Sequence, residues 1–571
     1  MHDLLIRGAT VVDGTGAPAR TADVAVSNGR FAAVGKSLRA ARREIDASGL
    51  LLTPGWVDIH THYDGQATWD PWMTPSSWHG VTSAVFGNCG VGFAPVRPGS
   101  ERYLINLMEG VEDIPETVLA EGIDFRWESF AQYLDVLESM PRIMDIGAQM
   151  PHAALRFYVM GDRGADHASA PTDNEIVRMG DLLEAALRAG ALGFTTSRTI
   201  KHRAKDGRFT PSLSAAEPEL AGLARAMRRA GSGVIEVNSD FGDGDFARLR
   251  AAAEIAGRPL SVLLLQVHNA PELWRETLAG IHAARASGLE ITGQVGTRPI
   301  GMMMALEGTI HPFLTHPLWQ AMDGLTPQAR VARLKADPEL RRRLWAELPD
   351  NTHTRWIGGM LERTFRLQEP LDYEPDMKDG VGAAAQAQGR DKFDVALEWL
   401  LEVDGKQILL HTFENYWSGD LEVVRTLLED PATVCGLGDA GAHVGYMCDA
   451  GSATSMLVHW TRQRTRGSRL PLEFLVKKQT ADTARAYGLL DRGVIAPGYK
   501  ADFNLIDFDA LRVRKPELVY DLPAGGKRML QKADGYRHTF VSGTEVMRDG
   551  EATGELPGRL IRGERPRPTA S

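Results

Sequence analysis

The chain of 571 residues contains only three cysteines, Cys89, Cys435 and Cys448. Three thiols are too few for a disulfide framework, and they are typical of a protein in a reducing compartment. The sequence also lacks an uninterrupted run of about twenty apolar residues, the length that a membrane-spanning helix requires. Its start lacks the basic residues, apolar run and small-residue cleavage site of a secretory signal. We therefore expect a soluble, cytoplasmic protein without a membrane partner.

A stripe of Lys and Arg with interleaved aromatic residues is missing as well. The chain has 64 basic and 74 acidic residues and a formal net charge of −10. Because this balance repels polyanions, nucleic acid is not an expected partner, and a small-molecule substrate is favoured. Hydrophobic residues at 43% and charged residues at 24% are globular values. The length suits one large domain with one smaller unit.

The two ends of the chain share one pattern. Residues 1–55 and 490–571 contain short runs with apolar residues at every second position, separated by Gly, Asn and Asp turns. This pattern is typical of small antiparallel strands. Neither end has helices with which to cover such strands. We predict that the two segments together form a composite β-sandwich domain around a continuous domain at 56–489.

The middle of the chain alternates short apolar runs with helical stretches. Examples are DLLEAALRAGALGFTTS and LAGLARAMRRAGSGVIEVNS, and LEVDGKQILLHTF is counted among the same units. Repeated strand and helix units predict an α/β fold with a parallel sheet, here a closed (β/α)₈ TIM barrel. An open, doubly wound sheet is the alternative. Near 303–395 helical pieces replace the strands, which predicts an insertion that either covers the barrel mouth or decorates its periphery.

The segment VDIHTHYD contains the clearest chemical signal of the sequence. His60 and His62 are two residues apart, so on a strand their side chains point to the same face and can bind one ion. Imidazole nitrogen favours zinc first, with manganese, iron or cobalt as alternatives. We predict a metal site here.

Two further residues follow apolar runs at expected strand ends. Asp439 in GLGDAGAH can contact a metal and accept a proton from water, although Asp-Ala-Gly also suits a plain turn. Cys89 in FGNCGVGFAP lies in a Gly-rich loop that allows close backbone approach, so it is a candidate ligand or a buried structural thiol.

Substrate contacts are predicted from residues around these strand ends. Arg198 in GFTTSRTIKHR and Arg298 in QVGTRPIG each offer a guanidinium group that suits a substrate carboxylate, or an ordinary surface ion pair. Tyr63 directly follows the two histidines and is a candidate for substrate contact or for packing.

Taken together, these stretches resemble the N-acyl-D-amino-acid deacylase (D-aminoacylase) group of the amidohydrolase superfamily. The similar segments are the start LLIRGATVVDGTG, then PGWVDIHTHYDGQ, GNCGVGFAP, GLGDAG and the closing DRGVIAPGYKADF, in that order. The resemblance implies a (β/α)₈ barrel, a β-sandwich built from both termini, and zinc at the barrel mouth. It also implies that His60, His62 and Cys89 are ligands and that Asp439 binds metal and acts as general acid and base.

The sequence departs from this group at two positions. Members usually carry one ligand histidine on each of two middle barrel strands, whereas the best-aligned residues here are Asn238 and Gln266. Neither is a strong zinc ligand, so one ion is favoured over two. His268 lies two residues beyond Gln266 and faces the same way on a strand, which makes it a candidate contact for metal or substrate.

The resulting hypothesis is a metal-dependent hydrolase of small amides, an N-acyl-(D-)amino-acid deacylase first, with metal-activated water and Asp439 as general acid and base. A hydrolase of another amide, a carbamate or an ester is the alternative on the same site. A relative that retains the barrel as an inactive scaffold is the alternative of another class. Association into a homo-oligomer is left open, because no segment marks an interface.

Overall fold

Parallel strands form the centre of the molecule in the computed structural model, which describes residues 1–242 and 244–569. They pair in the orders β6-β7-β8 and β9-β10-β11-β12-β13-β17. The two sheets meet where Leu192 N donates to Ala148 O, and the circle closes where Asp439 N donates to His60 O at 2.9 Å. The strands are β6 (Trp56–Asp58), β7 (Val81–Phe86), β8 (Asp145–Ala148), β9 (Met150–Pro151), β10 (Gly193–Arg198), β11 (Val234–Ser239), β12 (Leu260–Leu263), β13 (Ile291–Val295) and β17 (Thr433–Cys435). The predicted barrel is confirmed, and the open sheet is not.

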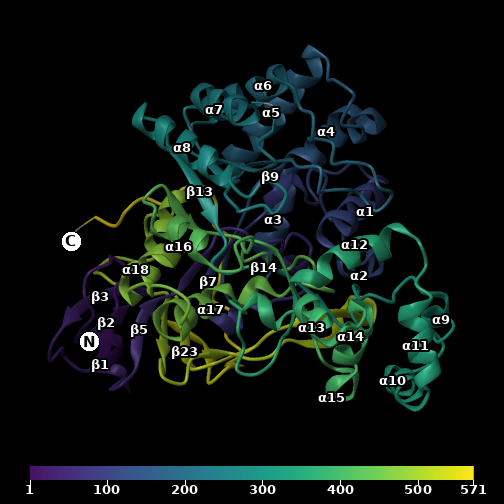
Figure 1. The fold of residues 1–571 in the computed structure, drawn as a ribbon. Coiled ribbons are helices and arrows are strands. Elements are labelled where there is room, and N and C mark those ends of the chain that lie inside the picture. Colours follow the sequence, from purple (N-terminus) through teal and green to yellow (C-terminus); the bar gives the residue numbers. More distant parts are fainter. Residues whose placement is uncertain (243, 570–571) are drawn as a thin grey trace.

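Helices cover the outside of the barrel, with α5 to α8 forming the upper layer in Figure 1. Helix α5 shows why these segments are helical: Thr172 and Glu175 form a capping box at its start, and Gly190 ends it in the left-handed region. Because helices cover the outer face, strands such as β7 are buried along their whole length. The covering helices are α1 (Glu101–Glu112), α2 (Glu116–Gly122), α3 (Phe130–Ser139), α4 (His152–Met160), α5 (Asp173–Ala189), α6 (Glu217–Ala230), α7 (Asp245–Ala256), α8 (Leu273–Ala286), α16 (Glu422–Glu429), α17 (Ser452–Val458), α18 (Leu472–Lys477) and α19 (Thr483–Ala486).

Both ends of the chain build one nine-stranded sheet beside the barrel, in the order β25-β24-β23-β18-β5-β1-β2-β3 with β4 against β1. Antiparallel pairing of Leu52 with Leu505 joins the two ends. The rings of Phe503 and Phe540 stack at 4.4 Å in the core of this sheet. Its strands are β1 (His2–Val11), β2 (Arg20–Ser27), β3 (Arg30–Gly35), β4 (Ala41–Asp46), β5 (Leu51–Pro54), β18 (Phe503–Ile506), β23 (Tyr536–Val541), β24 (Thr544–Arg548) and β25 (Glu551–Ala552).

The insertion leaves the barrel after β13 and returns before β17, and it occupies the right of Figure 1. It is largely helical, as expected, but it also contains an antiparallel sheet in the order β14-β16-β15. The prediction that ILLHTF is a barrel unit was therefore wrong, since short buried strands look alike in parallel and antiparallel sheets. The elements are β14 (Ile300–Met304), β15 (Thr364–Arg366), β16 (Leu409–Glu414), α9 (Pro317–Gln320), α10 (Pro327–Ala336), α11 (Pro338–Ala346), α12 (Thr352–Met360), α13 (Val381–Gln388), α14 (Lys392–Leu400) and α15 (Glu402–Gly405).

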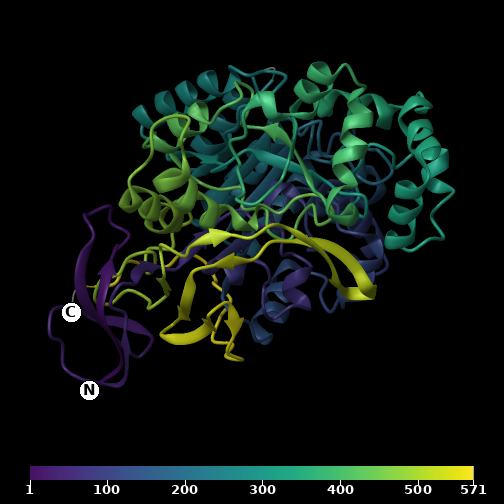
Figure 2. The same ribbon diagram turned by 60° about the horizontal axis from the view of Figure 1, so that its bottom comes forward.

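A long ribbon leaves the terminal sheet and runs along the barrel toward the insertion, drawn in yellow in Figure 2. Its strands are β19 (Arg512–Val513), β20 (Glu517–Leu522), β21 (Gly526–Leu530) and β22 (Ala533–Asp534). Lys527 Nζ donates to Glu307 O in the insertion, and Met529 N donates to Val444 O at 2.6 Å. The ribbon thus contacts the loop that follows β17.

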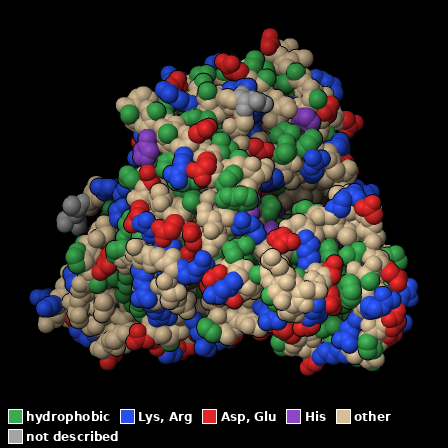
Figure 3. All heavy atoms as spheres, in the orientation of Figure 1, with side chains coloured by type: hydrophobic (Ala, Val, Ile, Leu, Met, Phe, Trp, Pro, Cys, Tyr) green, Lys and Arg blue, Asp and Glu red, His purple; other side chains and the backbone are tan. Residues whose placement is uncertain are grey.

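Charged side chains of both signs are interspersed over the face shown in Figure 3, which is hollowed near its centre. Among the residues that the structure describes, no helix combines the length and the apolar character needed to cross a membrane.

Candidate metal centre

Four side chains from three strand ends meet at one mouth of the barrel. His60 and His62 follow β6, Cys89 follows β7, and Asp439 follows β17. Asp439 Oδ1 lies 3.4 Å from His60 Nε2 and 3.6 Å from His62 Nε2. Cys89 Sγ lies 3.5 Å from His60 Nε2. The structure therefore brings together all four side chains that were predicted to hold a metal.

The backbone around these residues is bent so that the side chains face inward. Cys89 and Asp439 have φ values of 54° and 42°, a region that costs energy for residues other than glycine. Gly87, two residues before Cys89, has a φ of 84°, and a Cβ atom there would lie 2.3 Å from Gln149 O. Only glycine fits this position, which explains the Gly-rich loop of the sequence.

The acceptor at each Nδ1 atom sets the direction in which each imidazole points. His60 Nδ1 lies 2.8 Å from Gln294 Oε1, and Gln294 Nε2 donates to Ser261 Oγ at 2.9 Å. This arrangement places the proton of His60 on Nδ1 and leaves the lone pair of Nε2 facing the cluster. His62 Nδ1 faces Glu112 Oε1 at 3.4 Å.

Burial and neighbouring charges shift the pKa values of the cluster residues in different directions. Burial lowers the pKa of His60 to about 4. Burial would also lower the pKa of His62, but the carboxylates of Glu112 and Asp439 outweigh it and raise that pKa to about 9. Burial would raise the pKa of Asp439, but the hydrogen bond from His62 and the imidazole charges lower it to about 2. Asp439 is therefore ionised near neutral pH.

Two more buried carboxyl groups, Glu112 and Glu236, lie beside the histidines, and burial raises their pKa values to about 7 and about 8. Glu236 Oε1 lies 3.8 Å from His60 Nδ1, and Glu236 Oε2 accepts from Cys89 N at 3.0 Å. Glu112 Oε1, Glu236 Oε1 and His62 Nδ1 are buried without a hydrogen-bond partner in the described part of the chain. A cation would compensate this concentration of acidic groups, and two imidazoles, a carboxylate and a thiol are donors that suit zinc.

Asn238 and Gln266, the two residues that differ from the resembled group, form contacts within the protein. Asn238 Nδ2 lies 3.6 Å from Cys89 Sγ and 3.3 Å from His202 Nε2. Gln266 Oε1 accepts from Trp417 N at 3.1 Å, and Gln266 N donates to Asn415 Oδ1 at 2.9 Å. Gln266 thus ties the segment after β16 across the end of a barrel strand, so the return from the insertion lies at the mouth.

The side chains of the two predicted arginines have carboxylate partners elsewhere. Arg198 Nε donates to both oxygens of Asp245, at 2.8 and 3.0 Å. Arg298 Nη2 donates to Asp449 Oδ1 at 2.8 Å and to Cys448 O at 2.7 Å. Both arginines are buried. Neither guanidinium forms a hydrogen bond or an ion pair with the four-residue cluster.

The other two predicted substrate contacts differ from each other. Tyr63 is fully buried and donates to Ser76 Oγ at 2.7 Å, away from the histidines. His268 lies at the mouth, where its ring is 5.8 Å from that of Trp417 and its Nε2 has no partner among the described residues. His268 N and Lys201 Nζ both donate to the carboxylate of Glu414, at 2.8 and 2.7 Å.

The sequence motifs do not indicate Glu112 and Gln294 as members of the site, and they indicate Glu236 only by its position relative to Asn238. Glu112 ends an ordinary amphipathic helix, and Glu236 and Gln294 lie within strands. Glu236 is the one with a local signal, because it precedes Asn238 by two residues and so shares its face.

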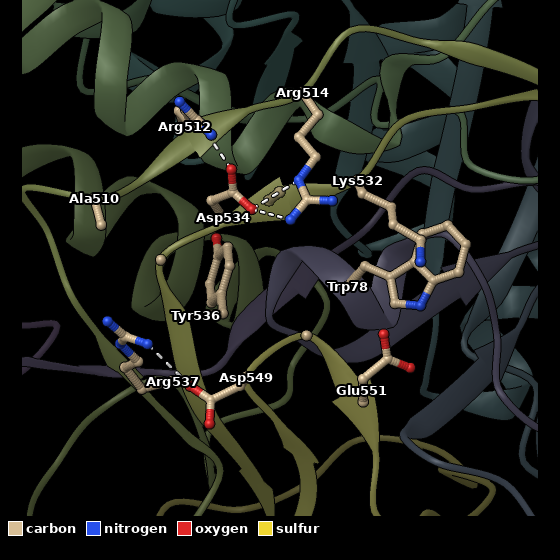
Figure 4. A pocket seen from close by; sticks show the side chains of 13 residues that line it. Trp78, Ala510, Arg512, Arg514, Lys532, Asp534, Tyr536, Arg537, Asp549 and Glu551 are labelled. Atoms are coloured by element: carbon tan, nitrogen blue, oxygen red, sulfur yellow. Dashed lines mark hydrogen bonds and ion pairs between the residues drawn. The ribbon is translucent and has the colours of Figure 1, made fainter.

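A separate surface pocket of about 510 Å³ lies where β22 and β23 pass Trp78, and Figure 4 shows its lining. It shares no residue with the cluster. Its arginines face acidic partners, since Arg512 and Arg514 pair with Asp534 and Arg537 pairs with Asp549. Lys532 lies over the ring of Trp78.

Comparison with known proteins agrees with this geometry. The chain is 29% identical over 569 residues to a D-aminoacylase of Alcaligenes xylosoxydans xylosoxydans, covering 98% of this chain and 97% of that one. It is 29% identical over 564 residues to an N-acyl-D-aspartate deacylase of the same organism, covering 98% and 95%. These matches confirm the resemblance found in the sequence.

Solved structures match over the same length. An N-acyl-D-glutamate deacylase from Bordetella bronchiseptica, complexed with zinc and a phosphonate inhibitor, superimposes with a TM-score of 0.64 at 25% identity, covering 98% of this chain and 99% of that one. A D-aminoacylase described for its binuclear metal centre gives 0.65 at 25% identity, covering 99% and 100%. The family model described as "Amidohydrolase family" matches residues 43–547. This protein therefore belongs to the amidohydrolase family, and it is an enzyme of metal-dependent amide hydrolysis.

Proposed function

We propose that this protein deacylates N-acyl amino acids, D-isomers first, with one divalent ion, zinc, bound at the barrel mouth. The observation that carries the proposal is that His60 Nε2 and His62 Nε2 both face Asp439 Oδ1, at 3.4 and 3.6 Å. The near full-length similarity to D-aminoacylase supports the choice of substrate.

His60, His62 and Asp439 would hold the ion, and Cys89 would be its fourth ligand. The potential ligand atoms of His60, His62 and Cys89 lie within 4.8 Å of one another. A second ion is not favoured, because the amide of Asn238 contacts Cys89 and Gln266 is engaged with the segment after β16.

When bound, the ion would lower the pKa of a water molecule and polarise the substrate carbonyl. The ionised Asp439 carboxylate accepts the proton that the attacking water loses and then donates it to the leaving nitrogen. The carbon–nitrogen bond breaks, and a carboxylic acid and an amino acid are released. Burial keeps bulk water from competing for the histidines.

Donor groups line the approach to this centre and would suit a substrate that carries a carboxylate. Asn238 contacts both Cys89 and His202, and Lys201 and His268 lie beside Glu414. Of the four substrate contacts expected from the sequence, we retain His268, whose Nε2 is unpaired among the described residues. Arg198 and Tyr63 are not part of the proposal, because their polar groups bind other protein atoms. Arg298 is not part of it because Asp449 and Cys448 hold its Nη2 atom, while its Nε and Nη1 atoms are buried without a partner among the described residues. The cytoplasmic location is also proposed, and it is supported by three free cysteines.

The test combines elemental analysis with an assay of N-acyl-D- and N-acyl-L-amino acids. We expect about one zinc per chain, lost in His60→Ala, and hydrolysis abolished in His60→Ala and Asp439→Asn. Glu398→Gln, on an exposed part of the insertion, is the matched control and should retain both the zinc and the hydrolytic activity. A protein without stoichiometric metal that hydrolyses nothing after zinc is added would support the scaffold alternative. If the protein hydrolyses only carbamates or esters, the proposed substrate class of N-acyl amino acids is wrong and the alternative substrate class is correct.

A further inference from the structure

Glu112 is a buried carboxylate that contacts the metal cluster from behind. It is the last residue of α1 and is 1% exposed. Its Oε1 atom lies 3.4 Å from His62 Nδ1, and its Oε2 atom lies 3.5 Å from His443 Nε2. We infer that Glu112 is a positioning residue of the metal centre, which orients His62 and fixes the loop that carries Asp439.

The role of Glu112 in orienting His62 follows from a comparison of the surroundings of His60 and His62. Each presents Nε2 to Asp439 and Nδ1 to an acceptor behind it, and for His60 the acceptor is the neutral amide of Gln294. For His62 the corresponding group is the Glu112 carboxylate. Neither His62 Nδ1 nor Glu112 Oε1 forms a hydrogen bond in the described ranges, so the ion-pair contact of 3.4 Å is what couples the two side chains. A carboxylate behind a ligand histidine fixes the ring and makes it a stronger donor.

The second part concerns the loop after β17. His443 N donates to the backbone oxygen of Glu112, and Tyr446 OH lies 3.1 Å from His443 Nδ1. The neighbouring Asp113 accepts from Gly445 N at 3.3 Å. Asp439 and His443 both have left-handed backbone angles, with φ of 42° and 47°. The end of α1 therefore holds a strained loop at several points, and Glu112 supplies both a side-chain and a backbone contact.

One residue thus acts on two of the proposed ligands, His62 directly and Asp439 through His443. The inference rests on the proposed metal site, but it does not depend on the substrate. Glu112→Gln keeps the shape of the side chain and removes its charge, whereas Glu112→Ala removes the acceptor. Loss of a group behind a ligand histidine costs on the order of 10–100-fold in metal affinity.

The experiment measures zinc affinity of the metal-free, full-length protein by competition with a chromophoric chelator. We expect Glu112→Gln to bind zinc about 10-fold more weakly and Glu112→Ala up to about 100-fold more weakly. Glu109→Gln, on the same helix where Glu109 pairs with Lys205 at 2.7 Å, is the matched control and should bind normally. At saturating zinc, the Gln variant should show a lower kcat with KM little changed.

Thermal unfolding of the metal-free variants separates misfolding from loss of affinity, and the nearly isosteric Gln variant remains informative if the Ala variant does not fold. Unchanged zinc affinity in a folded Glu112→Gln protein would overturn the inference, as would zinc binding that His62→Ala leaves intact. Weaker zinc binding in the Glu112 variants, together with no deacylation by any form of the protein, would uphold the inference and overturn only the proposed substrate.

Discussion

Gln294 on β13 holds His60 from across the barrel, with 2.8 Å between Gln294 Oε1 and His60 Nδ1. Gln294 is itself fixed by Ser261 Oγ at 2.9 Å, and all three residues are buried. The direction of a proposed ligand on the first barrel strand therefore depends on two later strands. His60 has this acceptor only when β13 lies in the assembled barrel, so the orientation of this proposed ligand depends on the complete fold.

Removal of this amide should weaken the site. Gln294→Leu leaves the Nδ1 proton of His60 without an acceptor, so zinc affinity should fall by about 10–100-fold and stability by roughly 1–3 kcal/mol. Chelator competition and chemical denaturation measure the two effects. Gln386→Leu, on a helix of the insertion, controls for the substitution itself. Normal zinc binding by the Leu variant would show that His60 needs no such support.

Cys89 should bind the metal as a thiolate. Burial raises the pKa of this thiol well above its usual value, and the nearby carboxylates raise it further. The sulfur is therefore protonated in the metal-free protein. A bound ion must displace that proton, and affinity therefore falls as pH is lowered. The cobalt-substituted protein should show a thiolate charge-transfer band in the near ultraviolet that Cys89→Ser lacks. Cys435→Ser, a buried thiol outside the cluster, should keep the band. A band that survives in Cys89→Ser would exclude this ligand.

Histidines introduced at Asn238 and Gln266, the two positions that differ from the resembled group, should allow a second ion to bind. Asn238 contacts Cys89 Sγ, so Asn238→His puts an imidazole beside that thiol. We expect Asn238→His combined with Gln266→His to raise the metal content from about one to about two ions per chain by elemental analysis. The double variant should also lose stability, because Gln266 binds the backbone of Trp417. Two ions in the unaltered protein would contradict the single-ion proposal.

The sequence predicts some parts of this site and not others for physical reasons. His60 and His62 are predictable because alternation along a strand places them on one face within a single segment. Cys89 and Asp439 depend on resemblance, since a Gly-rich loop and an Asp-Ala-Gly turn have ordinary structural uses. Gln294 is not predictable from local pattern, because its contact with His60 spans 234 residues of sequence and exists only in the closed barrel.

The same limit applies to the fold. Repeated strand and helix units predict the barrel, because the period of the apolar residues is a local property. They do not distinguish β16 from a barrel strand, because its apolar run is equally compatible with antiparallel pairing to β14 and β15. Burial of Arg198 and Arg298 is likewise invisible locally, since their partners Asp245 and Asp449 become neighbours only after folding.

Acid should loosen the contact between the insertion and the barrel through Glu374. This carboxylate accepts from Arg464 Nε at 3.0 Å and from Leu421 N at 2.9 Å, and it lies 3.1 Å from His459 Nε2. Burial would raise its pKa, but the bonds from His459 and Arg464 outweigh burial and lower the pKa to about 2, from an ordinary value of 4.5. Because the folded state binds this proton less readily than the unfolded state, the stabilisation is complete above about pH 4.5 and is lost as pH falls toward about 2.

Glu374→Gln removes the charge and leaves Arg464 only partly paired, so it should reduce the free energy of unfolding by roughly 3–5 kcal/mol at neutral pH. At about pH 3 the difference in free energy of unfolding between the variant and the unaltered protein should shrink. At that pH the unfolded chain of the unaltered protein binds a proton at Glu374, whereas the folded protein largely does not. Urea denaturation at the two pH values measures this, with Glu398→Gln as the control because Glu398 forms an exposed pair with Arg390. A constant difference across this pH range would mean that the charge of Glu374 does not stabilise the contact.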